Sequence, residues 1–160
     1  MEKSRKRRLV WVCILAFLVV AWTATIFAQS AKNGEESTED SNKVLEIIEE
    51  VAESVGIDAE VSSHFVRKMA HFSEYLILGV LASLLLLVMG GGWRLGGAFA
   101  YAVLVAVCDE FIVQRLSEGR APMVTDVLID TSGAFVGLLA VVAIFWLMDK
   151  VRQNRNKTIL

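Results

Sequence analysis

The most prominent feature of the sequence is a set of long apolar stretches separated by polar segments. Four of them stand out, at 9–28, 69–89, 95–113 and 127–148. Each is about 20 residues long, which is the length that an α-helix needs to cross about 30 Å of hydrocarbon. The pattern therefore predicts an all-α integral membrane protein with four transmembrane helices.

The polar segment between the first two stretches divides into two parts. Residues 29–42 are rich in Ser, Glu, Asn and Gly, which is typical of a linker. Residues 43–55 carry Val44, Ile48, Val51 and Val55 at helical spacing, with glutamates between them. This spacing predicts a short acidic amphipathic helix. We expect it to rest on the outer surface of the bundle, with partner binding as the alternative.

The first apolar stretch has a second interpretation, as a cleaved signal peptide. Basic residues precede it, and Ala28-Gln29-Ser30 resembles a small-residue cleavage site. Its apolar run is longer than the roughly 7–15 residues of a usual signal sequence. We therefore expect a retained anchor. Cleavage would leave three helices without moving the charged residues described below.

Composition and charge agree with a membrane protein and indicate its orientation. Hydrophobic residues make up 55% of the 160 residues, mean hydropathy is +0.54 and net charge is −2. Basic residues crowd positions 3–8 and 150–157, directly beside apolar stretches. Such flanks set orientation in the membrane, so a nucleic-acid partner is not expected. We predict a multi-pass protein of the cell membrane with both termini in the cytoplasm.

This orientation assigns each polar segment to one side of the membrane. Residues 29–66 and 114–126 are predicted outside, and the short turn at 90–94 is predicted inside. Four regions follow: 1–28, a basic tail and the first helix; 29–66, the outer linker and amphipathic helix; 67–148, a three-helix core; 149–160, a basic tail.

Ionisable residues cluster at three of the predicted helix ends. The second helix starts, the third ends and the fourth starts on the same side, so their polar groups arrive at one depth. A charge in the lipid core costs about 2.5–3.5 kcal/mol on insertion scales, so these side chains are expected to face the bundle interior and pair. The candidate catalytic residues are His71, Glu74, Asp109, Glu110 and Asp130, and the candidate ligand-binding residues are Arg67, Lys68, Tyr75, Arg120 and Asp126.

Acids exceed bases in this cluster, so a cation, a shared proton or a basic ligand can complete the charge balance. Three interpretations stay open: a structural salt-bridge network, a functional polar site without metal, and a zinc or manganese site made by imidazole and carboxylates. The sequence has no His-Glu-x-x-His motif, so we expect no metal and assign no cofactor. A nucleophile-elbow motif is also missing, and the sequence leaves open whether the protein is an enzyme.

Two glycines on the fourth predicted helix add a packing prediction. Gly133 and Gly137 lie four residues apart, on the face that carries Asp126 and Asp130. Small residues at this spacing let helix backbones approach closely. We therefore expect this face to pack inward. Gly96 and Gly97 are candidates for the same role on the third helix.

The charged motifs resemble those of the VanZ-like family of bacterial membrane proteins. The residues that carry the resemblance occur in the family's order at helix ends: Arg67-Lys68, His71-Phe72, Glu74-Tyr75, Asp109-Glu110, Gly119-Arg120, Asp126, Asp130 and Gly133. They cover about residues 60–148. Gln114 lies four residues after Glu110, one more than the family's spacing, and this fits a one-residue insertion.

The resemblance implies a role in the bacterial cell envelope. The family's founder is linked to low-level resistance to teicoplanin, a glycopeptide antibiotic that binds cell-wall precursors. A binding role in glycopeptide tolerance is therefore one hypothesis. A membrane enzyme acting on a lipid-linked or phosphorylated envelope substrate is the alternative, and a purely structural protein is a third. The expected partners are a membrane lipid or an envelope precursor, with a homo-oligomer as a further option.

Overall fold

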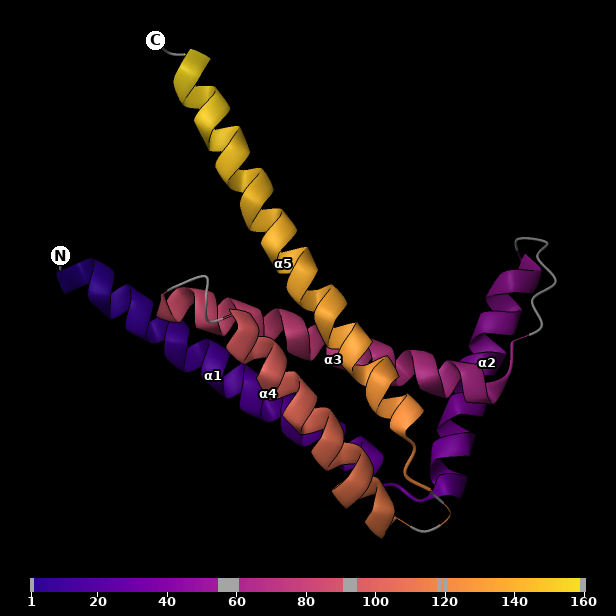
Figure 1. The fold of residues 1–160 in the computed structure, drawn as a ribbon. Helices are drawn as coiled ribbons and strands as arrows, with labels where there is room; N and C mark the ends of the chain where they lie inside the picture. The colour runs from indigo at the N-terminus through magenta and orange to yellow at the C-terminus, as the bar shows by residue number, and fades with distance from the viewer. Residues whose placement is uncertain (1, 55–60, 91–94, 118, 120, 159–160) are drawn as a thin grey trace.

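The chain folds into helices throughout the part that the structure describes. This computed structural model describes residues 2–54, 61–90, 95–117, 119 and 121–158 and contains no strand among them. Four helical segments are long and apolar enough to cross a membrane. The elements, shown in Figure 1, are α1 (Glu2–Ser30), α2 (Gly34–Ser54), α3 (Ser63–Met89), α4 (Leu95–Cys108), the π-helix η2 (Asp109–Val113), the 3-10 helix η3 (Gln114–Leu116) and α5 (Val124–Thr158).

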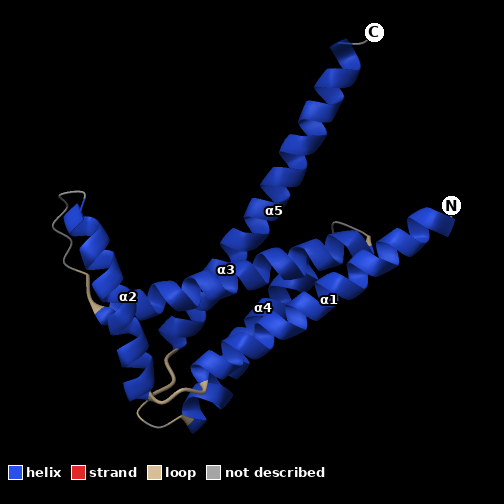
Figure 2. Cartoon of the chain, turned by 180° about the vertical axis from the view of Figure 1, so that it is seen from behind, coloured by secondary structure: helices blue, strands red, loops and turns tan. Residues whose placement is uncertain are grey.

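Successive membrane-length helices run in alternating directions (Figures 1 and 2). At one end, the Arg8 side chain donates hydrogen bonds to the carbonyls of Val88, at 2.8 Å, and of Met89. At the other end, Ser117 Oγ donates to the Ser30 carbonyl at 3.2 Å. The ends of α1 and α4 therefore lie beside the starts of α3 and α5. The predicted convergence of three helix ends is confirmed, and α1 adds a fourth.

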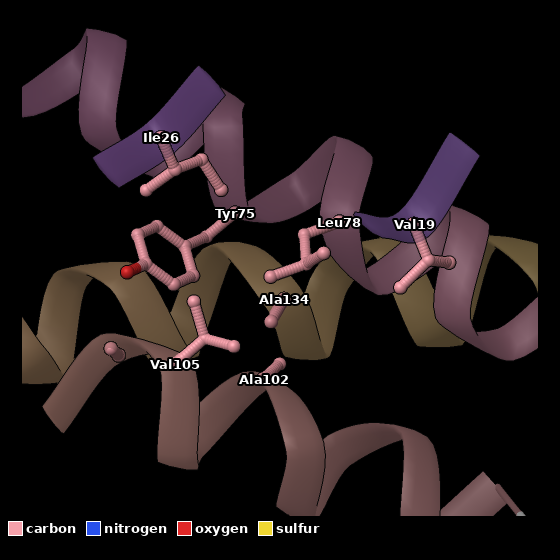
Figure 3. Close-up of a cluster of buried hydrophobic side chains, with 8 residues drawn as sticks. Val19, Ile26, Tyr75, Leu78, Ala102, Val105 and Ala134 are labelled. Carbon is pink, nitrogen blue, oxygen red and sulfur yellow. The ribbon is translucent and has the colours of Figure 1, made fainter. Parts of the chain in front are cut away.

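The core is a cluster of apolar side chains contributed by all four long helices. Figure 3 shows the Tyr75 ring between Ile26 of α1 and Val105 of α4. Ile26 and Tyr75 are fully buried. Helix α1 therefore contributes Val19 and Ile26 to this core. The other buried members are Leu78, Ala102, Ala106 and Ala134.

Glycines bring α3 and α5 into close contact, as their spacing predicts. A Cβ atom on Gly133 would collide with the Phe72 carbonyl, and one on Gly137 with the Leu76 carbonyl. Gly79 of α3 meets the α5 backbone at Ala134 in the same way. The inward packing of this α5 face is confirmed. The expectation for Gly96 is wrong, because a Cβ there would meet nothing within 4 Å.

The outward faces of the long helices are apolar, which fits a lipid environment. Phe17 is 71% exposed and Leu104 is 60% exposed. On α5, Leu128 and Trp146 are similarly exposed. Contiguous apolar surface of this extent is rare on a soluble monomer. We therefore treat the protein as a multi-pass membrane protein.

Helix α2 begins earlier than the sequence indicated, so the linker prediction is wrong for residues 34–42. Asn33 caps the helix, because its side-chain Oδ1 accepts from the Glu36 amide at 2.8 Å. Glu35 and Glu36 lie in the first turn, where negative charge is favoured by the helix dipole. Capping and charge together explain a helix in a composition that is typical of a linker.

Two other boundaries also differ from the sequence prediction. Ser62 caps α3, accepting from the Phe65 amide at 3.2 Å, so this helix includes a turn before Arg67. Gly90 ends α3 with φ 96°, a conformation that suits glycine. The rest of the predicted turn at 91–94 lies outside the described residues. Helix α5 continues through much of the predicted basic tail.

Candidate functional site

A polar pocket lies at the end of the bundle where α3 and α5 begin and α4 ends. Its cavity has a volume of about 160 Å³. Basic groups lie in its wall on the first two turns of α3, and carboxylates come from α5. The lining residues are His64, Arg67, Lys68, His71, Gln114, Gly119, Ala121, Met123, Asp126, Ile129 and Asp130.

Three side chains of types that can ligate a metal come together at this pocket from three helical segments. His71 comes from α3, Asp109 from η2 and Asp130 from α5, and one potential ligand atom of each lies within 4.8 Å of the others. His71 Nδ1 lies 3.9 Å from Asp130 Oδ1. Asp109 and Asp130 are both 0% exposed. We call these three residues the triad cluster.

Ser30 holds one member of the triad cluster in place. Its hydroxyl, at the end of α1, donates to Asp109 Oδ2 at 2.8 Å, and it is fully buried. Gln114 Nε2 lies 3.4 Å from the same oxygen. Because α1 supplies a hydrogen bond to a member of the triad cluster, the first helix contributes to the site.

Glu110 accepts hydrogen bonds that fix the chain just before α5. Its Oε1 accepts from the Met123 amide at 2.6 Å, and its Oε2 accepts from Gln114 Nε2 at 2.5 Å. Glu110 is 0% exposed. It therefore anchors the chain just before α5, and its carboxylate is engaged in packing rather than directed into the pocket.

The π-helix at Asp109–Val113 explains the spacing of Gln114. The Gln114 amide bonds to the Asp109 carbonyl, five residues back. A π-turn accommodates one extra residue in an α-helix and is frequent at functional sites. The π-turn thus accommodates the one-residue insertion inferred from the sequence. Gln114 still bonds to both Asp109 and Glu110.

The rim of the pocket carries an ion pair between α3 and α5. Lys68 Nζ lies 2.7 Å from Asp126 Oδ1, and both side chains are about one-quarter exposed. Arg67 and His64 line the same rim. The rim therefore carries both basic groups and the acid Asp126, whereas the carboxylates of Asp109 and Asp130 are fully buried.

Not every predicted site residue lies in this pocket. Glu74 lines a neighbouring groove instead. Tyr75 is 0% exposed within the apolar core and is not among the lining residues, so the prediction that it binds ligand has no support from its position. Arg120 lies outside the described residues. The pocket brings together Arg67, Lys68, His71, Asp126 and Asp130.

An apolar groove between α2 and α3 adjoins the pocket. It has a volume of about 650 Å³, and its apolar wall includes Val44, Ile48 and Phe65. Arg67 and His71 line both the groove and the pocket. The two spaces therefore share part of their lining. The groove is mainly apolar but also has Lys32, Asp40 and Glu74 in its wall, and the pocket is charged.

Comparison with known proteins identifies the family. The VanZ/LLP1 family model matches residues 15–147. The chain belongs to the VanZ/LLP1 family. The match extends the sequence resemblance, which covered about residues 60–148, to include most of α1. Neither the search of curated proteins nor the search of solved structures found a match. The family assignment for this VanZ/LLP1 protein therefore rests on the family model.

Sequence reasoning missed two polar residues of the site. Ser30 is a single serine at the end of an apolar stretch, and nothing nearby in the sequence connects it with Asp109. His64 lies one turn before Arg67, and the Ser62 cap was the available signal that the helix extends that far. Both residues lie in helical turns that extend beyond the apolar stretches from which the helices were predicted, at the end of α1 and the start of α3.

Proposed function

We propose that this VanZ/LLP1 protein binds an amphiphilic envelope lipid, with its phosphate headgroup in the pocket and its chain in the groove. The observation that carries the proposal is the shared lining: Arg67 and His71 border both the polar pocket and the apolar groove. A lipid phosphate is anionic and is attached to an apolar chain, so it matches both spaces at once.

The rim supplies suitable donors for a phosphate. The guanidinium of Arg67 can form paired hydrogen bonds to phosphate oxygens. Lys68 is 24% exposed at its side chain and adds a positive charge, which is shared with Asp126. Hydrogen bonds to charged groups contribute about 1.5–3 kcal/mol each. Arg67 is therefore expected to dominate headgroup affinity.

Polyisoprenyl phosphates are one class of lipid that would fit both the pocket and the groove. Envelope precursors are carried on polyisoprenyl phosphates, and the resemblance described above links the family's founder to glycopeptide resistance. We infer that lipid binding at this site alters access to envelope precursors and thereby glycopeptide tolerance. The proposal places the pocket in the outer leaflet of the cell membrane.

Binding is tested with purified full-length protein in detergent and lipids of defined headgroup. The probes are a polyisoprenyl phosphate, phosphatidylglycerol, phosphatidylcholine and inorganic phosphate. We expect both anionic lipids to bind more tightly than phosphatidylcholine, and inorganic phosphate, which lacks a chain, to bind weakly. Arg67→Gln should weaken binding of the anionic lipids about tenfold, since 1.4 kcal/mol is a factor of ten. Equal affinity for all headgroups would contradict the proposal.

Arg115→Gln is the matched control for that variant. Arg115 is exposed at the same end of the bundle and is not among the pocket-lining residues. The Arg115→Gln substitution removes the same positive charge without changing a residue of the pocket. If Arg115→Gln weakens binding as much as Arg67→Gln, the attraction is general surface electrostatics and the pocket is not the binding site.

The triad cluster favours a second candidate function, an enzyme acting on the same class of lipid. Headgroup binding alone does not require His71 between two buried carboxylates. In an enzyme, Arg67 and Lys68 would hold the anion while His71 transfers a proton. The candidate predicts turnover of a phosphate-bearing lipid, lost in His71→Ala at normal protein levels. A protein that binds lipid without turnover excludes this candidate and leaves the binding role.

A further inference from the structure

The triad cluster has the chemistry of a metal site. It offers one imidazole and two carboxylates, and these ligand atoms lie within 4.8 Å of one another. The residues come from α3, η2 and α5, so the tertiary fold brings them together rather than a local sequence motif. The absence of a His-Glu-x-x-His motif therefore does not bear on this site.

Asp130 supplies an independent indication of a ligand. Its side chain is 0% exposed, and neither carboxylate oxygen has a hydrogen-bond partner among the described residues. His71 Nδ1 lies 3.9 Å from Asp130 Oδ1, beyond hydrogen-bond distance. A buried carboxylate without hydrogen bonds is costly unless it is neutralised or coordinates a metal.

Lys68 does not neutralise Asp130, and His71, at 3.9 Å, does so only when it is protonated. Lys68 is engaged with Asp126 at the rim. Asp109 is a second acid in the same cluster and is itself held by Ser30. Asp109 and Asp130 therefore place two buried carboxylates close together, and a bound cation would satisfy them together.

We propose that His71, Asp109 and Asp130 bind one divalent transition-metal ion, of the zinc or manganese class. Imidazole favours such ions over magnesium or calcium, and carboxylates are compatible with both. Three protein ligands leave a coordination position open, as in catalytic zinc sites. His71 and Asp130 also line the pocket, so the open position faces the proposed headgroup. This role rests on the proposed function, whereas binding of the metal does not.

The side chains can close on an ion with small movements. Ligand atoms of a tetrahedral zinc site lie about 3.4 Å apart, given bonds of about 2.0–2.1 Å, so the separations must contract from 4.8 Å or less. Asp130 can rotate without breaking a hydrogen bond among the described residues. Ser30 meanwhile orients Asp109 through Oδ2, which is the usual outer-shell support of a metal ligand.

The test is metal binding by the purified full chain, stripped with a chelator and titrated with zinc chloride, manganese chloride and magnesium chloride in the absence of added lipid. We expect one zinc or manganese ion per chain and weaker magnesium binding. Asp130→Asn and His71→Gln should each lower affinity at least a hundredfold. Asp149→Asn is the control, because Asp149 is an exposed carboxylate of the same helix, α5, outside the pocket and the triad cluster, and it should retain affinity within about threefold.

Thermal unfolding distinguishes a lost ligand from a lost fold. Zinc or manganese should raise the melting temperature of the wild type and of Asp149→Asn, but not that of Asp130→Asn. In the metal-free state Asp130→Asn should melt at or above the wild-type temperature, since it removes an unpaired buried charge. No metal binding by the wild type, or equal binding by Asp130→Asn, would overturn the inference.

The metal inference and the proposed function fail in different ways. Lipid binding in excess chelator, with no metal binding, would remove the metal and leave the headgroup site. Metal binding without any preference for anionic lipid would remove the headgroup proposal and leave the metal site.

Discussion

The Ser30 hydroxyl donates a hydrogen bond to the buried carboxylate of Asp109 across 2.8 Å, joining the end of α1 to the start of η2, which follows α4 directly. These residues are far apart in the chain, yet both are fully buried. The bond makes the first helix a structural element of the polar site. The match of the family model from residue 15 onward is consistent with this arrangement.

Ser30→Ala should destabilise the protein by about 1–3 kcal/mol, because it leaves a buried acceptor with fewer hydrogen bonds. Thermal unfolding in detergent would measure the change. Ser132→Ala is the matched control, since Ser132 is exposed and bonds only within its own helix, to the Ile129 carbonyl. If the two variants lose stability equally, the bond to Asp109 contributes no more to stability than a hydrogen bond within one helix.

The Gly133 contact gives a steric prediction. Gly133→Ala should destabilise the α3–α5 crossing by about 1–3 kcal/mol, the usual cost of overpacking, because the new Cβ meets the Phe72 carbonyl. The yield of folded protein and its melting temperature would show the effect.

Gly96→Ala is the opposite case on α4. Its Cβ would meet nothing within 4 Å, and alanine is favoured over glycine in a helix by about 0.5–1 kcal/mol. We therefore expect Gly96→Ala to be neutral or stabilising. A Gly133→Ala variant as stable as Gly96→Ala would contradict the close approach of the two helices.

Helix number and convergence could be predicted from sequence for a simple physical reason. Apolar stretches of spanning length must alternate in direction, so charged ends such as those at Lys68 and Asp126 arrive on one side. The four-residue spacing of Gly133 and Gly137 likewise indicates a contact face by itself. These features depend on length and periodicity, which are local properties of the chain.

Other features depend on tertiary placement, which local patterns do not contain. Glu74 follows His71 by three residues, which rotates it about 60° around the helix axis, and this offset places it in the groove rather than the pocket. Helix α2 was missed in part because Ser, Thr and Glu are common in linkers, whereas the Asn33 cap acts through geometry. Ser30 could be assigned only once α1 and α4 were seen together.

A pH prediction concerns the start of α2. The hydrogen bond from Lys32, at 2.7 Å, and the charge of Lys32 hold the pKa of the Asp40 carboxyl below its ordinary value of 3.8. The contact is therefore complete above pH 3.8 and is lost as the pH falls through the lowered pKa. The protection of α2 amides, relative to their intrinsic exchange rates, should stay constant from pH 7 to pH 4 and decrease in stronger acid.

Asp40→Asn separates this contact from general acid effects. The variant cannot carry the charge, so α2 should exchange at one protection level on both sides of pH 3.8. If the wild type and Asp40→Asn show the same acid response, the Lys32–Asp40 pair does not hold the start of the helix.

The central claim is that the helix ends forming the pocket lie on the same side of the membrane. It is tested by single-cysteine labelling with a membrane-impermeant reagent, in a chain whose Cys13 and Cys108 are replaced. Exposed positions Phe65, Val124 and Gln153 each receive a cysteine. We predict that 65 and 124 are labelled in intact cells and 153 only after permeabilisation. Labelling of 65 and 124 from opposite sides would contradict the account.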